Sequence, residues 1–199
     1  MSDDGDYRVH LDEPRLDAIR QPPSHDGGYT SEAQRERVNW VIRKSEGSIL
    51  DIGCAEGYVL GKLAGERVGV DIDRERLKAA QLRYPDCRYY CMDVTFGLPF
   101  HDQEFDTVLI AEMLEHIPLE DSRRLIFEAL RVAKKKLVIT MPFAKENYDP
   151  AMVDNPSHEW HVTEETVKRL FDGVPNAFEV NKVKYTQGQD FILISVVRS

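Results

Sequence analysis

The sequence predicts an α/β fold with a doubly wound sheet of seven strands, mostly parallel and closed by a C-terminal antiparallel hairpin. Short apolar runs alternate with amphipathic segments over residues 31–141, which is the pattern of a parallel sheet covered by helices. Several of these runs end in an acidic residue. Residues 178–197 instead form two apolar runs around the turn-forming tripeptide Gln187-Gly188-Gln189, as expected of a hairpin.

The composition is that of one soluble globular domain. The 199 residues are enough to bury a substantial core, and the net charge of −9 disfavours broad, unspecific binding to nucleic acid or membranes. The sequence contains neither a basic, apolar leader nor the roughly 18 consecutive apolar residues that span a bilayer. We therefore expect a cytoplasmic protein, and its three cysteines are expected to be free thiols.

Residues 1–29 are polar and acidic, contain several prolines, and show no sustained periodicity. They predict a mobile N-terminal arm, with a lid over a ligand as the alternative, ahead of a single domain at residues 30–199. A helix is expected from Ser31 to Gly47, because Ser31 and Gln34 form a capping box and the apolar residues share one face (Val38, Val41 and Ile42).

The next segment, residues 48–57, predicts a buried strand that runs into a ligand-binding turn. Residues 48–52 are apolar and partly β-branched, apart from Asp51, as in a strand that is covered on both faces. Gly53 and Gly57 let the backbone approach a ligand where a Cβ would obstruct it.

The remaining elements follow from periodicity and from residues that start or stop helices. Asp73 and Thr163 are N-caps, and Pro85 and Pro142 are stop signals. The expected order is a short helix at 58–64, a strand ending at 71, a helix from 74, strands at 87–92 and 105–111, a helix at 119–132, a strand at 137–141, a helix after 163, and strands at 178–185 and 191–197.

Acidic residues follow four of the predicted parallel strands. Asp51, Asp71, Asp93 and Glu112 come at or just after the ends of these strands. Ligands of open α/β sheets bind beyond the carboxyl ends of the strands. The four acidic residues should therefore converge on one crevice.

The turn at residues 51–57 distinguishes between two classes of cofactor. A dinucleotide-binding turn needs the spacing G-x-G-x-x-G for a pyrophosphate, whereas this chain has Asp51-x-Gly53-x-Ala55-x-Gly57 followed by Tyr58. A carboxylate at this place suits a cationic ligand. The pattern resembles the first motif of the class I S-adenosylmethionine (SAM) dependent methyltransferases, although Ala55 replaces that motif's usual middle glycine.

The resemblance implies a Rossmann-like fold, SAM as the cofactor and a set of binding residues. The turn would hold the methionine part of SAM, Asp71 the ribose hydroxyls, Ile72 a face of the adenine, and Asp93 with Val94 its amino edge. A carboxylate can accept from two hydroxyls, and an aliphatic side chain offers a flat apolar surface. The implied set is Asp51, Gly53, Cys54, Ala55, Gly57, Asp71, Ile72, Asp93, Val94, Ala111 and Glu112.

Two segments carry candidate catalytic residues. Residues 112–118 read Glu-Met-Leu-Glu-His-Ile-Pro, and on one helical turn Glu112, Glu115 and His116 would face the same way. His116 is the candidate base, with Glu115 to orient it. Residues 155–163, before the last helix, include the histidines 158 and 161, and we expect His161 to face His116 across the crevice.

The methyl acceptor is not identified by the sequence, and three readings remain. The favoured one is metal-free transfer of the methyl group to an oxygen atom of a small molecule. The second rests on a resemblance of the E-x-x-E-H motif to small-RNA 3′-terminal 2′-O-methyltransferases, and implies a divalent metal with candidate ligands Glu112, Glu115, His116, His158 and His161. The third is a non-catalytic SAM-binding partner subunit.

Overall fold

A computed structural model describes residues 32–143, 157–174, 178–184 and 191–198. The arm or lid predicted over residues 1–29 and the capping serine at position 31 lie outside the described residues. Within the described ranges, no helix is long and apolar enough to cross a membrane.

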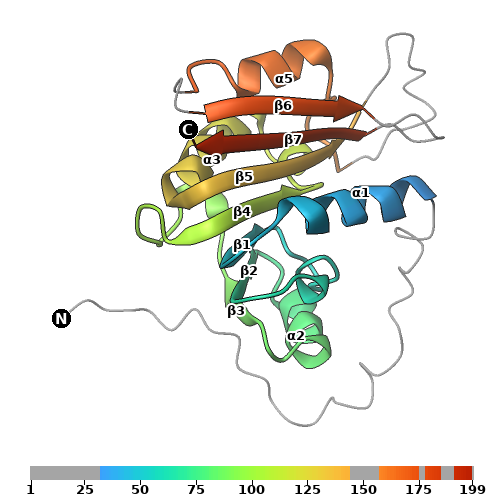
Figure 1. The fold of residues 1–199 in the computed structure, drawn as a ribbon, viewed down its shortest axis with the longest axis vertical. Coiled ribbons are helices and arrows are strands. Elements are labelled where there is room, and N and C mark those ends of the chain that lie inside the picture. Colours follow the sequence, from blue (N-terminus) through green and yellow to red (C-terminus); the bar gives the residue numbers. More distant parts are fainter. Residues whose placement is uncertain (1–31, 144–156, 175–177, 185–190, 199) are drawn as a thin grey trace.

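The described strands form one seven-stranded sheet in the order β3-β2-β1-β4-β5-β7-β6 (Figure 1). The strands from β1 to β5 pair in parallel, whereas β7 is antiparallel to both β5 and β6. The predicted doubly wound class with a C-terminal antiparallel pair of strands is therefore confirmed, whereas the turn predicted at Gln187-Gly188-Gln189 lies outside the described residues. The strands are β1 (Ile49–Ile52), β2 (Arg67–Asp71), β3 (Arg88–Cys91), β4 (Phe105–Ala111), β5 (Ala133–Pro142), β6 (Phe178–Lys184) and β7 (Phe191–Arg198).

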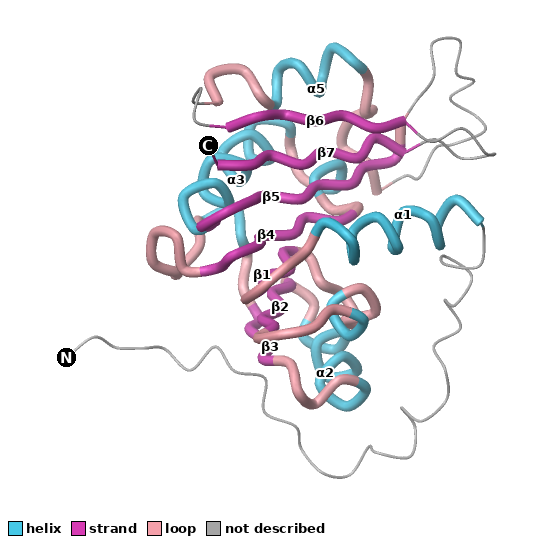
Figure 2. The backbone as a smooth tube through the Cα atoms, viewed as in Figure 1, coloured by secondary structure: helices cyan, strands magenta, loops and turns pink. Residues whose placement is uncertain are grey.

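Helices cover both faces of this sheet (Figure 2). One core packs α1 and α2 against the strands, and the other packs α3 and α5 against the opposite face. Neighbouring strand residues alternate between the two cores, as Ile49 and Leu50 do, because successive side chains of a strand point to opposite faces. The α-helices are α1 (Glu32–Lys44), α2 (Arg74–Arg83), α3 (Leu119–Val132) and α5 (Glu164–Leu170), with short 3-10 helices η3 (Leu60–Lys62), η4 (Val94–Phe96) and η5 (Leu114–His116).

The helix predicted at residues 58–64 is wrong in extent, because only the single turn η3 forms there. Gly57 has a φ of +73°, and a Cβ on Gly61 would lie 2.3 Å from the ring of Tyr84. Glycine also has low helix propensity. The segment is therefore shaped by close packing rather than by a regular helix.

The fifth strand begins earlier than predicted, directly after α3. Lys135 and Lys136 lie in this strand and form ion pairs with Asp106 and Glu46, respectively. The basic run Lys134-Lys135-Lys136 is thus at the amino end of β5, and two of its three lysines are paired with acidic residues.

Candidate active site

A cavity of about 520 Å³ lies at the carboxyl ends of the central strands. Its lining contains all four acidic residues that the sequence places after the strands, so the predicted convergence is confirmed in the geometry. The lining residues are Asp51, Gly53, Cys54, Ala55, Val59, Asp71, Ile72, Arg76, Met92, Asp93, Val94, Thr95, Ala111, Glu112, Met113, His116, Ile117 and Ser157.

The turn after β1 is shaped by close approach of the backbone to neighbouring residues. Gly53 has a φ of +74°, and a Cβ there would lie 2.5 Å from the side chain of Met113. The backbone N–H of Ala55 donates to Asp71 Oδ2 at 2.8 Å. This hydrogen bond ties the turn after β1 to the end of β2.

Ala55 has a φ of +48°, a conformation that costs an L-residue roughly 1 kcal/mol relative to glycine. We predict that Ala55→Gly raises the free energy of unfolding by up to about 1 kcal/mol, because it relieves this strain. Ala64→Gly is a matched control in the exposed loop before β2, outside the left-handed region, and should lower stability instead. Denaturant unfolding measures both, and equal effects of the two changes would contradict the prediction.

The two carboxylates at the ends of β2 and β3 hold the local backbone. Asp71 accepts from the backbone N–H groups of Ala55 and Asp73, and Asp93 accepts from the N–H and hydroxyl of Thr95. A carboxylate has capacity for further donors. Ile72 beside them is 68% exposed although it is aliphatic, so its side chain offers the cavity an apolar surface.

Asp51 is the most deeply buried carboxylate of the cavity lining, with 2% of its surface exposed. Burial, together with the nearby charge of Asp71, raises the pKa of Asp51 to about 8, and Arg37 opposes this shift. Burial penalises the charged form of a carboxyl group. A cationic ligand beside Asp51 would restore the charged form.

Glu112 departs from the helical arrangement that the sequence predicts. Its φ is +55°, and η5 begins only at Leu114, so Glu112 is not on one helical face with Glu115 and His116. Its carboxylate instead lies 4.0 Å from the buried guanidinium of Arg37. Burial raises the pKa of Glu112, while Arg37 and a hydrogen bond from Thr140 act in the opposite direction.

Sequence reasoning missed Arg37, which is 2% exposed. A signal for it was present, because Arg37 lies on the same helical stripe as Gln34 and Val41, at spacings of three and four residues. An arginine within an apolar stripe is unusual, since charged groups are almost never fully buried unless they are paired.

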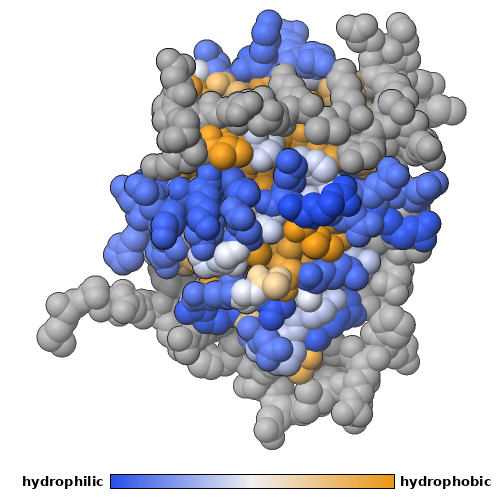
Figure 3. All heavy atoms as spheres, in the orientation of Figure 1, coloured by the Kyte–Doolittle hydropathy of each residue, from blue (hydrophilic) through white to orange (hydrophobic). Residues whose placement is uncertain are grey.

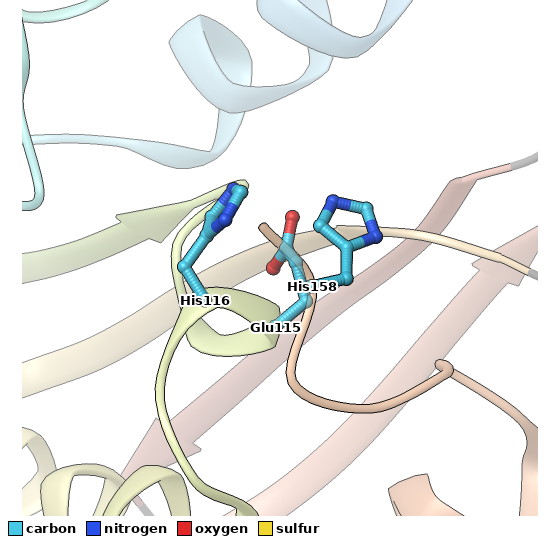
Figure 4. Close-up of side chains that lie close together, drawn as sticks. All are labelled: Glu115, His116 and His158. Carbon is cyan, nitrogen blue, oxygen red and sulfur yellow. The ribbon is translucent and has the colours of Figure 1, made fainter. Parts of the chain in front are cut away.

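A second group of side chains consists of Glu115, His116 and His158 (Figure 4). One potential ligand atom from each lies within 4.8 Å of the others. The two imidazole rings are 4.9 Å apart, centroid to centroid, in an edge-to-face arrangement. Glu115 is buried, and its pKa is raised to about 8 by burial and by the charge of Glu112.

The segment 157–160 brings His158 to this group. Glu159 N–H donates to the carbonyl of Glu115, and the Trp160 indole donates to the carbonyl of Ile117. His116 Nδ1 lies 3.1 Å from both the carbonyl and the hydroxyl oxygen of Ser157. These contacts place His158, rather than His161, against His116.

His161 is exposed and is not among the residues that line the cavity. It still acts on the group electrostatically, since burial and the charges of His116 and His161 lower the pKa of His158. His161 therefore lies near the cluster without being part of it.

Residues 49–136 match a family model described as "Methyltransferase domain". Two curated relatives are ubiquinone biosynthesis O-methyltransferases. The one from Hydrogenovibrio crunogenus is 32% identical over 94 residues, covering 44% of this chain and 38% of the relative. The one from Vibrio atlanticus is 31% identical over 93 residues, covering 41% and 39%. The matches thus span less than two fifths of these relatives.

Solved structures share the fold at low sequence identity. A magnesium protoporphyrin IX methyltransferase from Synechocystis PCC 6803, solved with bound SAH, has a TM-score of 0.65 at 16% identity and covers 93% of each chain. A small RNA methyltransferase has a TM-score of 0.68 at 19% identity, covering 83% of this chain and 25% of that one.

The sheet order and the solved structures give the chain a Rossmann-like fold, and residues 49–136 are similar to a methyltransferase domain. The matched segment is a little under half of the chain and contains the four strand-end acidic residues of the cavity (Asp51, Asp71, Asp93 and Glu112).

Proposed function

We propose that this chain transfers the methyl group of SAM to an oxygen atom of a small-molecule acceptor. The observation that carries the proposal is the composition of one cavity, which combines four strand-end carboxylates with the imidazole of His116. The carboxylates suit a ligand bearing an ammonium and a sulfonium, and the imidazole suits removal of a proton from a hydroxyl.

The cofactor would lie along the carboxyl edge of β1, β2 and the segment after β3. Asp71 has remaining acceptor capacity for the ribose hydroxyls, and Ile72 offers its exposed aliphatic side chain to the adenine. Asp93 and the buried Val94 border the same end of the cavity. At the other end, the glycine-containing turn with Cys54 and Ala55, together with Ala111 and Glu112, would bind the methionine part.

The acceptor would lie beside His116, where Met113 and Ile117 make the lining apolar. Methyl transfer from a sulfonium is an in-line displacement, so the protein mainly aligns the acceptor and excludes water. His116 Nδ1 contacts Ser157, which leaves Nε2 as the nitrogen that can accept the acceptor's proton. Glu115 and His161 are proposed to support this imidazole from nearby.

Titration calorimetry with SAM and SAH tests the first half of the proposal, and a methylation assay with labelled SAM against metabolite and RNA pools tests the second. Binding together with transfer to a small molecule is expected. Binding without transfer to any pool would favour a non-catalytic SAM-binding subunit. Absence of binding to folded, ligand-free protein would overturn the cofactor assignment.

Asp71→Ala is predicted to weaken SAM binding by about 1–3 kcal/mol, the usual scale for hydrogen bonds to a charged group. Because Asp71 also accepts from two backbone N–H groups, some loss of stability is expected as well. Asp86→Ala, at an exposed site before β3, is the control and should leave affinity unchanged. Calorimetry on both folded variants decides, and wild-type affinity in Asp71→Ala would show that the ribose is held elsewhere.

One observation favours a second candidate, a metal-dependent RNA 2′-O-methyltransferase. Glu115, His116 and His158 supply a carboxylate and two imidazoles within a small volume, and Glu115 Oε2 is buried with no hydrogen-bond partner among the described residues. This donor set fits a divalent transition metal. A bound metal would polarise the acceptor hydroxyl, and the three side chains would hold the ion.

Chelation separates the two candidates. In the favoured reading, methyl transfer is expected to continue in excess chelator, because SAM carries its own activated methyl group. In the second reading, chelation should abolish transfer, and His158→Ala should be as damaging as His116→Ala, since each removes one ligand from the same coordination sphere. Activity measured with and without added divalent metal checks this, and a chelator-insensitive enzyme eliminates the metal reading.

A further inference from the structure

We propose that Arg37 is a positioning residue that holds the Glu112 carboxylate ready to accept from the ammonium group of the cofactor. This inference rests on the proposed function and extends the cofactor site to helix α1. Arg37 is not among the residues that line the cavity, whereas Glu112 is. Arg37 would therefore act through Glu112 rather than by touching the ligand.

The environment of Arg37 differs from that of the other charged residues of α1. The exposed face of the helix is hydrophilic (Figure 3) and includes Arg35 and Arg43. The Arg37 side chain instead points into the protein beside β5 and β7. Its Nη1 donates to Thr140 Oγ1 at 3.1 Å, and its guanidinium carbon lies 5.5 Å from the centre of the Phe191 ring.

These contacts hold the guanidinium in one place. Nε donates to Gln34 Oε1 at 2.9 Å, so the planar group is bonded on two edges. A guanidinium has five donors in a rigid arrangement. Two of its nitrogens are used for anchoring, and Nη1 also faces the Glu112 carboxylate at 4.0 Å.

Glu112 shows two features of a residue held for a ligand. Its left-handed backbone is strained for a residue with a side chain, and its Oε1 is buried with no hydrogen-bond partner among the described residues. Strained residues are concentrated at binding sites, and an unsatisfied buried acceptor is costly until a donor arrives. Oε1 faces Arg37 Nη1 at 4.0 Å, while the Glu112 side chain as a whole is 23% exposed and lines the cavity, so an ammonium group would approach the carboxylate from the cavity side.

The charges of the site explain why a buried cation is needed. Asp51 is 2% exposed and Glu112 Oε1 is buried, so water solvates neither group well. The guanidinium of Arg37, which lies 4.0 Å from Glu112 Oε1, supplies a positive charge that favours the charged carboxylate to which an ammonium binds. Removing Arg37 would therefore weaken recognition of the ammonium and leave the adenosine end of the site unchanged.

The test measures four ligands by calorimetry: SAM and decarboxylated SAM, which carry both the ammonium and the sulfonium, SAH, which carries the ammonium alone and should follow SAM, and methylthioadenosine, which carries neither. In Arg37→Met, affinity for SAM and for decarboxylated SAM is expected to fall by about 10-fold to 100-fold, the scale of hydrogen bonds to charged groups. Affinity for methylthioadenosine should stay within about twofold. Arg43→Met, an exposed change on the same helix, should leave all of these affinities at their wild-type values.

The pairing with Glu112 is tested by a double-mutant cycle. Glu112→Gln should reproduce the loss, and the double variant should lose no more than either single variant, since both changes remove one interaction. Additive losses, or normal affinity for decarboxylated SAM in Arg37→Met, would overturn the inference, because Arg37 would then act independently of the ammonium site. Equal loss for methylthioadenosine would reduce Arg37 to a structural role.

A milder variant covers the case in which Arg37→Met does not fold. Thr140→Val removes the hydroxyl that accepts from Arg37 Nη1 and that also bonds to Glu112, so it loosens the pair from both sides and should give a smaller loss with the same ligand preference. Wild-type affinities for all of these ligands in folded Thr140→Val would also count against the inference. If the wild-type protein binds neither SAM nor SAH, the proposed function itself fails. If the wild-type protein binds them but the variants lose the same affinity for every ligand, only the role of Arg37 is rejected.

Discussion

Replacing His116 by alanine is expected to lower turnover by about 100-fold or more, with little change in SAM affinity. General acid–base catalysis contributes on this scale. His116 lines the acceptor end of the cavity, and its Nδ1 is occupied by contacts with Ser157. Steady-state kinetics gives the turnover, and calorimetry gives the affinity, so a loss of binding is separated from a loss of proton transfer.

His101→Ala is the matched control, because His101 is an exposed histidine in the loop before β4 and is not part of the cavity lining. Its turnover should remain at the wild-type level. His161→Ala tests the exposed histidine beside the cluster and should have a smaller effect than His116→Ala. Full activity in both the His116 and His161 variants would show that these residues only support the loop.

SAM affinity is expected to increase with pH up to about pH 8, by as much as about tenfold per pH unit. The pKa of Asp51 is raised to about 8 in the ligand-free protein, mainly by burial. At lower pH the carboxyl group is protonated, so a cationic ligand that binds to the charged form must first release that proton. Above the folded-state pKa the proton is already absent, and the dependence should level off.

Calorimetry between pH 6 and 9, in buffers with different ionisation enthalpies, counts the protons that binding releases. Asp51→Asn cannot release this proton, so its weaker affinity should be much less dependent on pH. A pH profile that is flat for the wild-type protein would contradict the assignment of Asp51 to the cationic part of SAM.

The raised pKa of Asp51 also makes the stability of the ligand-free protein depend on pH. Stability is expected to fall with rising pH, whereas SAM affinity is expected to rise. A carboxyl group whose folded-state pKa lies above its unfolded value binds more protons in the folded state, so stability falls as pH rises between the two values. For Asp51 this window extends from about pH 4 in the unfolded chain to about pH 8. Bound SAM should reduce the dependence of the free energy of unfolding on pH in this window.

Much of the fold is determined locally in the sequence. The strand at Phe105–Ala111 and the helix at Leu119–Val132 have the predicted bounds, because their apolar periodicity is strong and their flanking residues stop each element. Asp73 and Thr163 cap their helices as predicted. The convergence of Asp51, Asp71 and Asp93 was also predictable, since parallel strands bring their carboxyl ends to one edge of a sheet.

The partners of the site residues were decided only by the tertiary structure. The sequence placed Glu112 on a helical face with Glu115 and His116, but a left-handed backbone turns it toward Arg37, which comes from a helix 75 positions earlier in the chain. In the same way, His158 rather than His161 reaches His116. One backbone hydrogen bond from Glu159 and one from the Trp160 indole hold residues 157–160 against η5 and the residue after it. Periodicity along a chain records which face a residue occupies, whereas contacts between distant segments depend on how those segments pack.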